Sequence, residues 1–181
     1  MQPIFTMQYG EYITANFLKE KLKPCSVFIP CSAQEKGIDL VIGRFNGKTT
    51  KIQTIQVKTS RTYFPKNPNS EMCGYFWFNT FKIPENADWI IFVGIIPCSK
   101  NGENTISIKW KSVYLCMSNK EAKLFMENVK TKKGKPDRMF GFCFDVKGNF
   151  FQYRGNQDSD LKLINNFKIE NKLDLINDRL N

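Results

Sequence analysis

The sequence predicts a mixed α/β fold in a single domain, and three observations support this prediction. The chain has 181 residues, which is enough to bury one hydrophobic core. Hydrophobic residues make up 41% of the chain and charged residues 24%, as in globular proteins and unlike disordered chains. Segments of helical and of strand character alternate as helix, strands, helix, strands, which is the order of a mixed α/β architecture.

The expected elements follow from hydrophobic periodicity, turn residues and proline positions. Apolar residues at helical spacing, followed by Pro24, predict the first helix, and the Asn46-Gly47-Lys48 turn predicts a hairpin. Ser118 and Glu121 have the spacing of a capping box, which predicts a second helix. In order, we expect a helix at 7–22, strands at 26–30, 38–45 and 51–59, a loop at 60–74, strands at 75–78, 89–96, 105–110 and 113–116, a helix at 118–130, strands at 139–144 and 150–153, and a polar helix from residue 158.

The chain is basic and lacks histidine. It has 27 Lys and Arg against 17 Asp and Glu, a formal net charge of +10. This excess favours a polyanionic partner, either nucleic acid or an acidic membrane surface, although a lysine-rich compositional bias explains it equally well. Because histidine is absent, Ser/His/Asp and Cys/His nucleophiles, His-ligated catalytic zinc and His-based nucleases are excluded.

The cysteines and the hydropathy indicate a compartment. The six cysteines form no C-x-x-C pair, which favours buried free thiols in a reducing environment. The N-terminal residues have no signal-peptide pattern, and the longest apolar run, Trp89 to Cys98, is about half of a membrane span. We therefore expect a cytoplasmic protein that does not contact a membrane.

The predicted hairpin brings three polar side chains together. If Phe45 opposes Thr50, then Asp39 lies opposite Gln56. Because side chains alternate along a strand, Asp39, Gln56 and Lys58 share one face, and the apolar residues of both strands share the other. A one-residue slip would bury the polar set, so the hydrophobic pattern disfavours it.

This trio suits metal-assisted hydrolysis of a phosphodiester. An aspartate oxygen and nearby carbonyl oxygens are ligands that Mg²⁺ prefers, with Mn²⁺ as an alternative. Such a cation polarises a phosphodiester oxygen and lowers the pKa of a bound water. A lysine beside it orients the attacking water and offsets the charge that develops on the phosphate. None of these roles requires histidine.

Asp39 followed by Gln56-Val57-Lys58 on consecutive strands, after a helix bearing Glu11, resembles the PD-(D/E)XK nuclease superfamily. This is the restriction-endonuclease-like fold, which includes Holliday-junction resolvases and some homing endonucleases. The resemblance covers residues 7–96 and implies a central mixed sheet flanked by helices. It also implies Mg²⁺-dependent endonuclease cleavage of DNA, duplex or branched, that leaves a 5′-phosphate.

The resemblance assigns roles to individual residues. It makes Asp39 the metal-binding aspartate, Lys58 the motif lysine, Glu11 a further ligand and the Val57 carbonyl a backbone ligand. Gln56 occupies the (D/E) position, where it keeps an oxygen ligand but removes one negative charge, which weakens a cation site. The residue before Asp39 is isoleucine in place of the family's proline. Two other classes stay open: a nucleic-acid-binding module of the same fold that does not cut, and a structural or interaction protein.

Residues outside the motif are candidates for nucleic-acid contacts. Ser60 and Arg61 follow the motif lysine and are placed to contact a phosphate backbone. The densest basic run, which would track phosphates or form a solvated face, consists of Lys130, Lys132, Lys133 and Lys135. Gln34 and Glu35 precede the motif and lie either near the site or in a solvated loop. The aromatic residues of the last expected hairpin are expected in a core or a dimer interface.

We expect one domain over residues 1–181. Its nuclease-like core spans 7–96, additional strands and a helix span 97–157, and a C-terminal helical tail spans 158–181. The C-terminal half is expected to supply DNA contacts or the interface of a homodimer.

Overall fold

The computed structural model describes residues 4–30, 37–47, 50–66, 71–98, 109–157 and 161–181. It contains, in chain order, α1 (Ile4–Lys21), β1 (Ser26–Phe28), β2 (Leu40–Phe45), β3 (Thr50–Arg61), β4 (Met72–Asn79), β5 (Trp89–Cys98), β6 (Lys109–Ser118), α2 (Asn119–Glu127), β7 (Met139–Asp145), β8 (Phe150–Arg154), β9 (Lys162–Leu163), the 3₁₀ turns η1 (Asn165–Phe167) and η2 (Ile169–Asn171), and α3 (Leu173–Leu180). The chain is therefore mixed α/β, as the sequence predicts.

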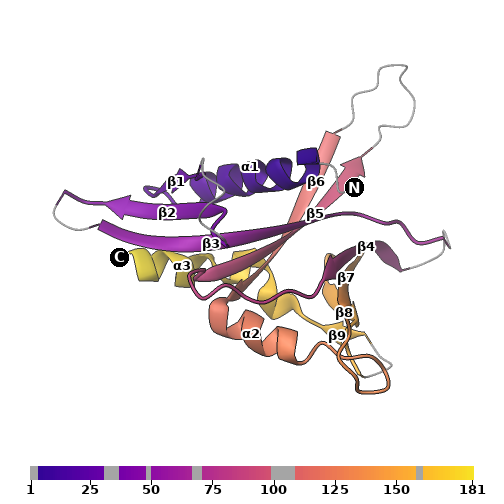
Figure 1. Cartoon of the computed structure of the whole chain (residues 1–181). Helices are drawn as coiled ribbons and strands as arrows, with labels where there is room; N and C mark the ends of the chain where they lie inside the picture. The colour runs from indigo at the N-terminus through magenta and orange to yellow at the C-terminus, as the bar shows by residue number, and fades with distance from the viewer. Residues whose placement is uncertain (1–3, 31–36, 48–49, 67–70, 99–108, 158–160) are drawn as a thin grey trace, which may run out of the picture.

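The strands form two sheets. The larger sheet has the order β1-β2-β3-β5-β6, and it is mixed because β3 and β5 run parallel while its other neighbours run antiparallel. The second sheet has the order β4-β7-β8-β9 and is antiparallel. In Figure 1, β3 runs through the middle of the molecule, with α1 above it and the second sheet at the lower right.

Each face of the larger sheet carries a hydrophobic core, and β5 contributes to both. Trp89, Ile91 and Val93 point into the helix-side core, where the sheet packs against α1, η2 and α3. Ile90 and Phe92 point into the sheet-side core, which is completed by α2 and the second sheet. The expectation of a sheet flanked by helices is thus correct for one face only, because the other face packs mainly against a second sheet.

The hairpin register matches the prediction. Phe45 pairs with Thr50 and Leu40 with Ile55. Leu40, Ile55 and Val57 lie in the helix-side core. The apolar pattern therefore selected the register in which Gln56 and Lys58 lie on the opposite face of β3, while Gln53 is buried on the core face with its amide hydrogen-bonded to Trp89 and Ile176.

Two expected loops contain more strand than the sequence predicts. The expected loop at 60–74 is shortened at both ends, because β3 continues to Arg61 alongside β5 and β4 already begins at Met72. The Thr62 hydroxyl also donates to the Ile95 carbonyl at 2.8 Å, so this polar side chain is satisfied beside the end of β3. The expected break between strands 105–110 and 113–116 is wrong, since Lys109–Ser118 pairs continuously with β5; residues 105–108 lie outside the described chain.

The C-terminal segment is not the polar helix expected from residue 158. It forms β9, two 3₁₀ turns and the short α3. Its apolar residues explain the difference, because Ile164 is buried in the sheet-side core while Ile169, Ile176 and Leu180 are buried in the helix-side core. A single straight helix would not reach both cores.

Several smaller predictions are confirmed. Ser118 caps α2 in a capping box with Glu121. The expected aromatic core is present, since Phe140, Phe142 and Phe150 are buried. In the described part of the chain, Cys25, Cys73, Cys116 and Cys143 are free thiols, and all of these except Cys73 are buried. No helix in the described part of the chain is long and apolar enough to cross a membrane.

Candidate active site

The site begins where β2 and β3 separate. Their pairing starts at Leu40–Ile55, and just before it the Asp39 N–H donates to the Ile55 carbonyl at 2.8 Å. The Val57 N–H then donates to Asp39 Oδ2 at 2.6 Å. Since backbone groups two residues apart point to the same edge of a strand, the Val57 carbonyl also faces this fork. A carboxylate and a backbone oxygen thus meet at the open edge of β3.

Helix α1 reaches the fork because of a glycine. A Cβ at Gly10 would overlap the Thr59 side chain, so glycine allows the helix backbone to lie directly on β3. Buried Ala15 and Leu18, farther along the helix, hold α1 on the helix-side core. Glu11, the next residue after this contact, is thereby brought to the edge of β3.

Glu11, Asp39, Val57 and Lys58 line one cavity of about 400 Å³. The sequence therefore predicted four residues that the fold brings together. It did not predict the opposite wall, which comes from Tyr63, from β4 and the segment after it, and from the start of β7. The residues of that wall are Tyr63, Trp77, Phe78, Asn79, Phe81 and Met139.

Both carboxyl groups of the cavity have a raised pKa. Burial is the main cause that raises the pKa of Glu11, the nearby Asp39 charge raises it further, and Lys58 opposes the shift. Burial also raises the pKa of Asp39, against the Val57 hydrogen bond and the Lys58 charge. Two partly buried carboxylates that repel each other favour uptake of a proton or of a cation.

Lys58 lies near these carboxylates but forms no ion pair with a described residue. Its Nζ lies 5.0 Å from the centroid of the Phe81 ring, a cation–π distance. None of the ion pairs within the described chain includes Lys58. The ammonium group thus remains available to a phosphate or a water in the cavity.

Gln56 occupies a different position from the other predicted ligands. It is only 7% exposed and is not among the residues that line the cavity. Its Oε1 is buried and has no hydrogen-bond partner within the described part of the chain. A buried amide oxygen without a partner is costly, so this atom is one that a cation or a water would stabilise.

The candidate ligand atoms are of the kind that a hard divalent cation prefers, but they carry little negative charge. Glu11, Asp39, the Val57 carbonyl and the Gln56 amide offer only oxygen atoms, which are the ligands of Mg²⁺ and Mn²⁺. Asp39 keeps Oδ1 for this purpose, because Oδ2 accepts from Val57. The described residues contain no group of three or more His, Cys, Asp or Glu side chains arranged to hold a metal.

Of the two residues predicted to contact phosphate after the motif, Ser60 is buried and Arg61 is exposed. Ser60 is 7% exposed, and its hydroxyl accepts from the Trp77 N–H at 3.1 Å and donates to the Arg61 carbonyl at 3.0 Å. Ser60 thus joins β3 to β4 inside the protein. Arg61 is exposed, and its guanidinium carbon lies 4.9 Å from the centroid of the Tyr63 ring, beside the cavity.

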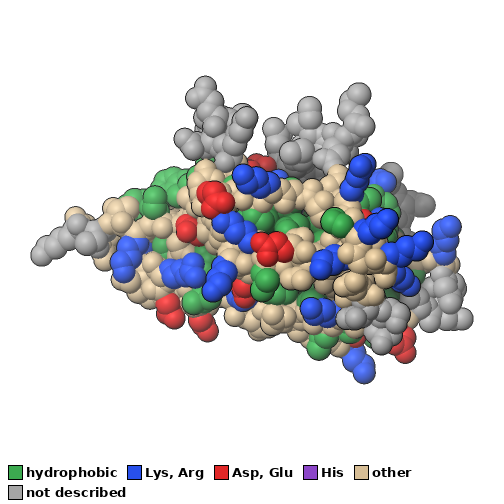
Figure 2. All heavy atoms as spheres, turned by 60° about the horizontal axis from the view of Figure 1, so that its bottom comes forward, with side chains coloured by type: hydrophobic (Ala, Val, Ile, Leu, Met, Phe, Trp, Pro, Cys, Tyr) green, Lys and Arg blue, Asp and Glu red, His purple; other side chains and the backbone are tan. Residues whose placement is uncertain are grey.

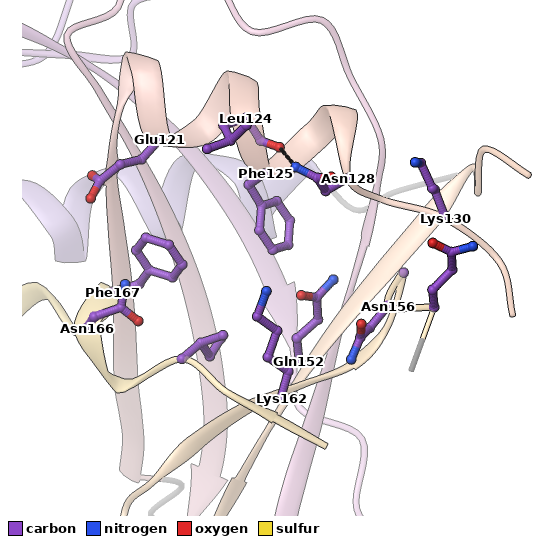
Figure 3. A pocket seen from close by; sticks show the side chains of 13 residues that line it. Glu121, Leu124, Phe125, Asn128, Lys130, Gln152, Asn156, Lys162, Asn166 and Phe167 are labelled. Carbon is purple, nitrogen blue, oxygen red and sulfur yellow. Dashed lines mark hydrogen bonds between the residues drawn. The ribbon is translucent and has the colours of Figure 1, made fainter. Parts of the chain in front are cut away.

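The predicted basic run lies away from the cavity wall. Lys132, Lys133 and Lys135 are exposed on a turn that the Thr131 N–H closes onto the Lys135 carbonyl at 2.7 Å. Lys130 is half-buried and lines a separate pocket of about 360 Å³ between α2, β8 and the C-terminal segment (Figure 3). Gln34 and Glu35 lie outside the described residues.

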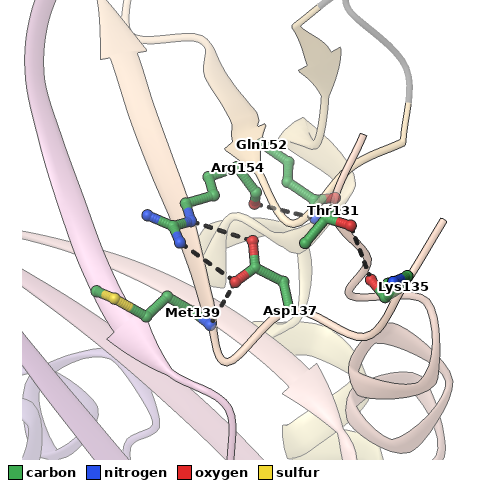
Figure 4. A network of polar contacts seen from close by, with 6 residues as sticks. All are labelled: Thr131, Lys135, Asp137, Met139, Gln152 and Arg154. Atoms are coloured by element: carbon green, nitrogen blue, oxygen red, sulfur yellow. Dashed lines mark hydrogen bonds and ion pairs between the residues drawn. The ribbon is translucent and has the colours of Figure 1, made fainter. Parts of the chain in front are cut away.

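An ion pair connects this basic turn to the cavity. Arg154 forms two hydrogen bonds with Asp137, at 3.1 and 3.2 Å, and Asp137 also accepts from the Met139 N–H at 3.1 Å (Figure 4). Met139 lines the cavity, and the guanidinium carbon of Arg154 lies 5.5 Å from the Trp77 ring centroid. The second sheet therefore presents an ordered wall to the site.

Charge alone does not mark a binding surface. Figure 2 shows Lys and Arg side chains spread across one face of the molecule from end to end, with Asp and Glu among them. The net charge of +10 is therefore not gathered into a single patch on this face.

Comparison with known proteins does not identify a family. No protein-family model matches the chain, and neither a curated protein nor a solved structure matches it. The function proposed below rests on the geometry of the cavity and on the residue pattern.

Proposed function

We propose that this protein is a metal-dependent endonuclease of restriction-endonuclease-like fold that hydrolyses phosphodiester bonds in DNA. The observation that carries the proposal is the convergence of Glu11, Asp39, Val57 and Lys58 on one cavity. These residues come from a helix, from the start of one strand and from the middle of the next. The nuclease motif requires these residues to meet where β2 and β3 separate. Polar residues that merely face solvent would have no reason to converge there.

The order of elements also supports a nuclease-like core. α1, the β2–β3 hairpin and the parallel strand β5 follow one another in the order that the resemblance implies for residues 7–96. β4 departs from a simple core, because it leaves the larger sheet and pairs with β7. The free and buried Cys25, Cys116 and Cys143 agree with a cytoplasmic site of action.

In this proposal, oxygen atoms hold Mg²⁺ or Mn²⁺ at the fork. Asp39 Oδ1, a Glu11 carboxylate oxygen and the Val57 carbonyl would be the ligands, and the unpartnered Gln56 Oε1, which does not line the cavity, would join them through a bridging water. The cation would polarise the scissile phosphate and acidify a water molecule. The Asp39–Val57 hydrogen bond fixes the orientation of the carboxylate before substrate binds.

Lys58 acts on water and phosphate. Its ammonium group orients the attacking water and offsets the negative charge that develops on the phosphoryl oxygens. The water oxygen forms a bond to phosphorus, the P–O3′ bond breaks, and the 3′ oxygen leaves as a hydroxyl after taking up a proton. The products are a 5′-phosphate and a 3′-hydroxyl, so the atoms of one water are consumed for each cut.

The test is cleavage by the purified chain of duplex, branched and single-stranded DNA with Mg²⁺ or Mn²⁺. We expect Lys58→Ala to lower the rate by about 100-fold or more, as for removal of one transition-state donor. Lys51→Ala is the matched control, because Lys51 is exposed at the far end of the same strand. Cleavage that survives Lys58→Ala, or that falls equally in Lys51→Ala, would refute the mechanism.

A second function is favoured by Gln56: a nucleic-acid-binding module that does not cut. The described cavity has two carboxylates rather than three acidic ligands, which weakens a cation site. This alternative predicts DNA binding that decreases with salt and no cleavage with either metal. If the chain does cut, both strands of a duplex are cleaved either by a homodimer or by two successive nicks. The sedimentation coefficient of the protein during cleavage distinguishes a dimer from a monomer.

A further inference from the structure

A groove lined by aromatic side chains lies beside the candidate active site. It has a volume of about 480 Å³, within the range of small-molecule sites. Its lining residues are Tyr63, Phe64, Pro65, Lys66, Tyr75, Trp77 and Tyr153. Tyr63 and Trp77 also line the cavity that holds Asp39 and Lys58, so the two hollows share a wall.

The base of this groove is fixed by the fold. Tyr63 and Tyr75 exchange backbone hydrogen bonds of 2.9 and 2.8 Å, which tie the end of β3 to β4. Tyr153 contacts Tyr75 and Trp77 edge to face, with ring centroids 4.9 and 4.6 Å apart. The rings are therefore ordered before a ligand arrives, which lowers the entropic cost of binding.

The rim of the groove exposes aromatic surface to solvent. Tyr63 is 42% exposed and Phe64 is 56% exposed. Phe64 makes no ring contact with another aromatic residue of the described chain, and more than half of its surface is exposed, so it offers aromatic surface for stacking. Two consecutive exposed aromatic residues beside a candidate active site are typical of a binding surface rather than of a core.

Cations surround these rings, and no acidic residue is among the lining residues. Arg61 lies over Tyr63, Arg154 lies over Trp77, and Lys66 lines the groove itself. Arg154 is partly neutralised by Asp137, whereas Arg61 and Lys66 are exposed and not in any ion pair of the described chain. Flat rings to stack on and cations at the rim fit a ligand that is both planar and anionic, as a nucleotide of a single strand is.

We propose that this groove binds an unpaired base of a DNA strand whose neighbouring phosphate lies in the active cavity. The inference rests on the proposed function and names its substrate class: DNA with a single-stranded segment at the cut. In a continuous duplex both faces of each base are covered by stacking, so a base must be unpaired or extruded to reach Phe64. Single strands, flaps and branched ends meet this requirement.

The experiment measures binding without cleavage. Fluorescein-labelled 12-mers are titrated with the protein in EDTA at fixed salt, and anisotropy gives the affinity for a single strand and for a blunt duplex. Phe64→Ala should weaken single-strand binding by about 5- to 150-fold, the effect of losing one stacked base, and should leave duplex binding unchanged. Phe64→Leu keeps apolar contact without an aromatic face and should lose most of the same affinity.

The matched control is Phe45→Ala. Phe45 is 54% exposed, close to the value for Phe64, but it lies at the far end of β2 beside Phe28. Its replacement should change neither affinity. An abasic scan adds a second readout, in which each strand lacks one base at a different position. Loss of the base at one position should weaken binding to the unaltered protein. The same loss should not weaken binding to Phe64→Ala.

The outcomes separate this inference from the nuclease proposal. Single-strand binding that depends on Phe64, in a chain that cuts nothing, would support the groove and refute the nuclease. Metal-dependent cleavage of a blunt duplex that is unchanged by Phe64→Ala, together with no preference for single strands, would refute the groove and leave the nuclease standing. Equal losses in Phe45→Ala and Phe64→Ala would also overturn the groove, because they would show that any exposed ring contributes.

Discussion

At the scale of single residues, the Asp39 side chain supplies the hydrogen-bond acceptor that β3 lacks just beyond the start of β2. Its N–H bonds to the Ile55 carbonyl and its carboxylate accepts the Val57 N–H, so it extends the β2–β3 ladder by one step with a side chain. A backbone carbonyl in the same place would satisfy Val57 but would offer no charge. Asp39 Oδ2 therefore satisfies the Val57 N–H, and Oδ1 remains free for a ligand. Burial at this position raises the pKa of the Asp39 carboxyl.

Gln56 is the residue whose replacement is most informative. Gln56→Glu places a carboxylate where the amide oxygen is now buried without a partner. We expect the metal-free variant to melt at a lower temperature, because an unpaired buried charge is costly. Mg²⁺ should restore the loss and bind more tightly than to the unaltered protein, since the site gains a negative charge. Calorimetric melting with and without Mg²⁺ measures both effects.

Gln53→Glu is the matched control for this substitution. Gln53 lies on the same strand and is also buried, but it accepts from the Trp89 indole and donates to the Ile176 carbonyl at 2.7 Å on the helix-side face. Its replacement should destabilise the protein without rescue by Mg²⁺. Equal rescue of both variants, or of neither, would show that Gln56 does not belong to a cation site.

At the scale of elements, the contact between α1 and β3 positions Glu11. Gly10 has Thr59 where a side chain would otherwise lie, so the helix backbone packs directly on the strand one residue before the glutamate. Glycine normally weakens a helix interior by about 1 kcal/mol relative to alanine, so its presence here requires a compensating role. Close packing of the helix on the strand is that role.

We therefore expect Gly10→Ala to destabilise the protein despite the better helix propensity of alanine. Overpacking at this contact should cost about 1–3 kcal/mol, measured by urea unfolding, and should move Glu11 away from Asp39. Metal affinity should fall with it. Asn16→Ala, an exposed site on the same helix, is the control and should be neutral or slightly stabilising. A stabilising Gly10→Ala would contradict this account of the helix position.

The sequence was sufficient for one wall of the site and not for the other. Asp39, Val57 and Lys58 follow from a turn and an alternating pattern over about twenty residues, and the predicted register is the observed one. Trp77 and Met139 reach the cavity because β4 lies outside the larger sheet and pairs with β7, sixty or more residues away along the chain. No local period encodes that pairing. The local sequence did predict a strand at 75–78, which contains the wall residues Trp77 and Phe78, but it did not indicate that this strand faces Asp39.

At the scale of the whole molecule, stability and metal binding are linked through protons. The raised pKa values of Glu11 and Asp39 mean that the folded state binds protons more tightly than the unfolded state does. Without metal, the free energy of unfolding should therefore fall as pH rises from the ordinary carboxyl pKa values to the raised ones, and should not change further from this cause above them.

Mg²⁺ should reverse this dependence, because it binds the ionised carboxylates. Its stabilisation should be nearly absent at pH values below the raised pKa values and should grow as pH rises through them. At a Mg²⁺ concentration 100 times its dissociation constant, stabilisation reaches about 2.7 kcal/mol, or about 5–10 °C in melting temperature for a chain of this size. Melting curves from pH 4.5 to 8, with and without Mg²⁺, measure the difference.

Asp39→Asn separates a specific site from general salt effects. Asparagine can still accept the Val57 N–H, so the fork should stay intact, while the pH-dependent part of the Mg²⁺ effect should largely disappear. Asp178→Asn, at an exposed position of α3, should behave like the unaltered protein. An Mg²⁺ effect of the same size at pH 4.5 and pH 8, or one that persists in Asp39→Asn, would mean that the cation acts elsewhere and that the fork between β2 and β3 is not a metal site.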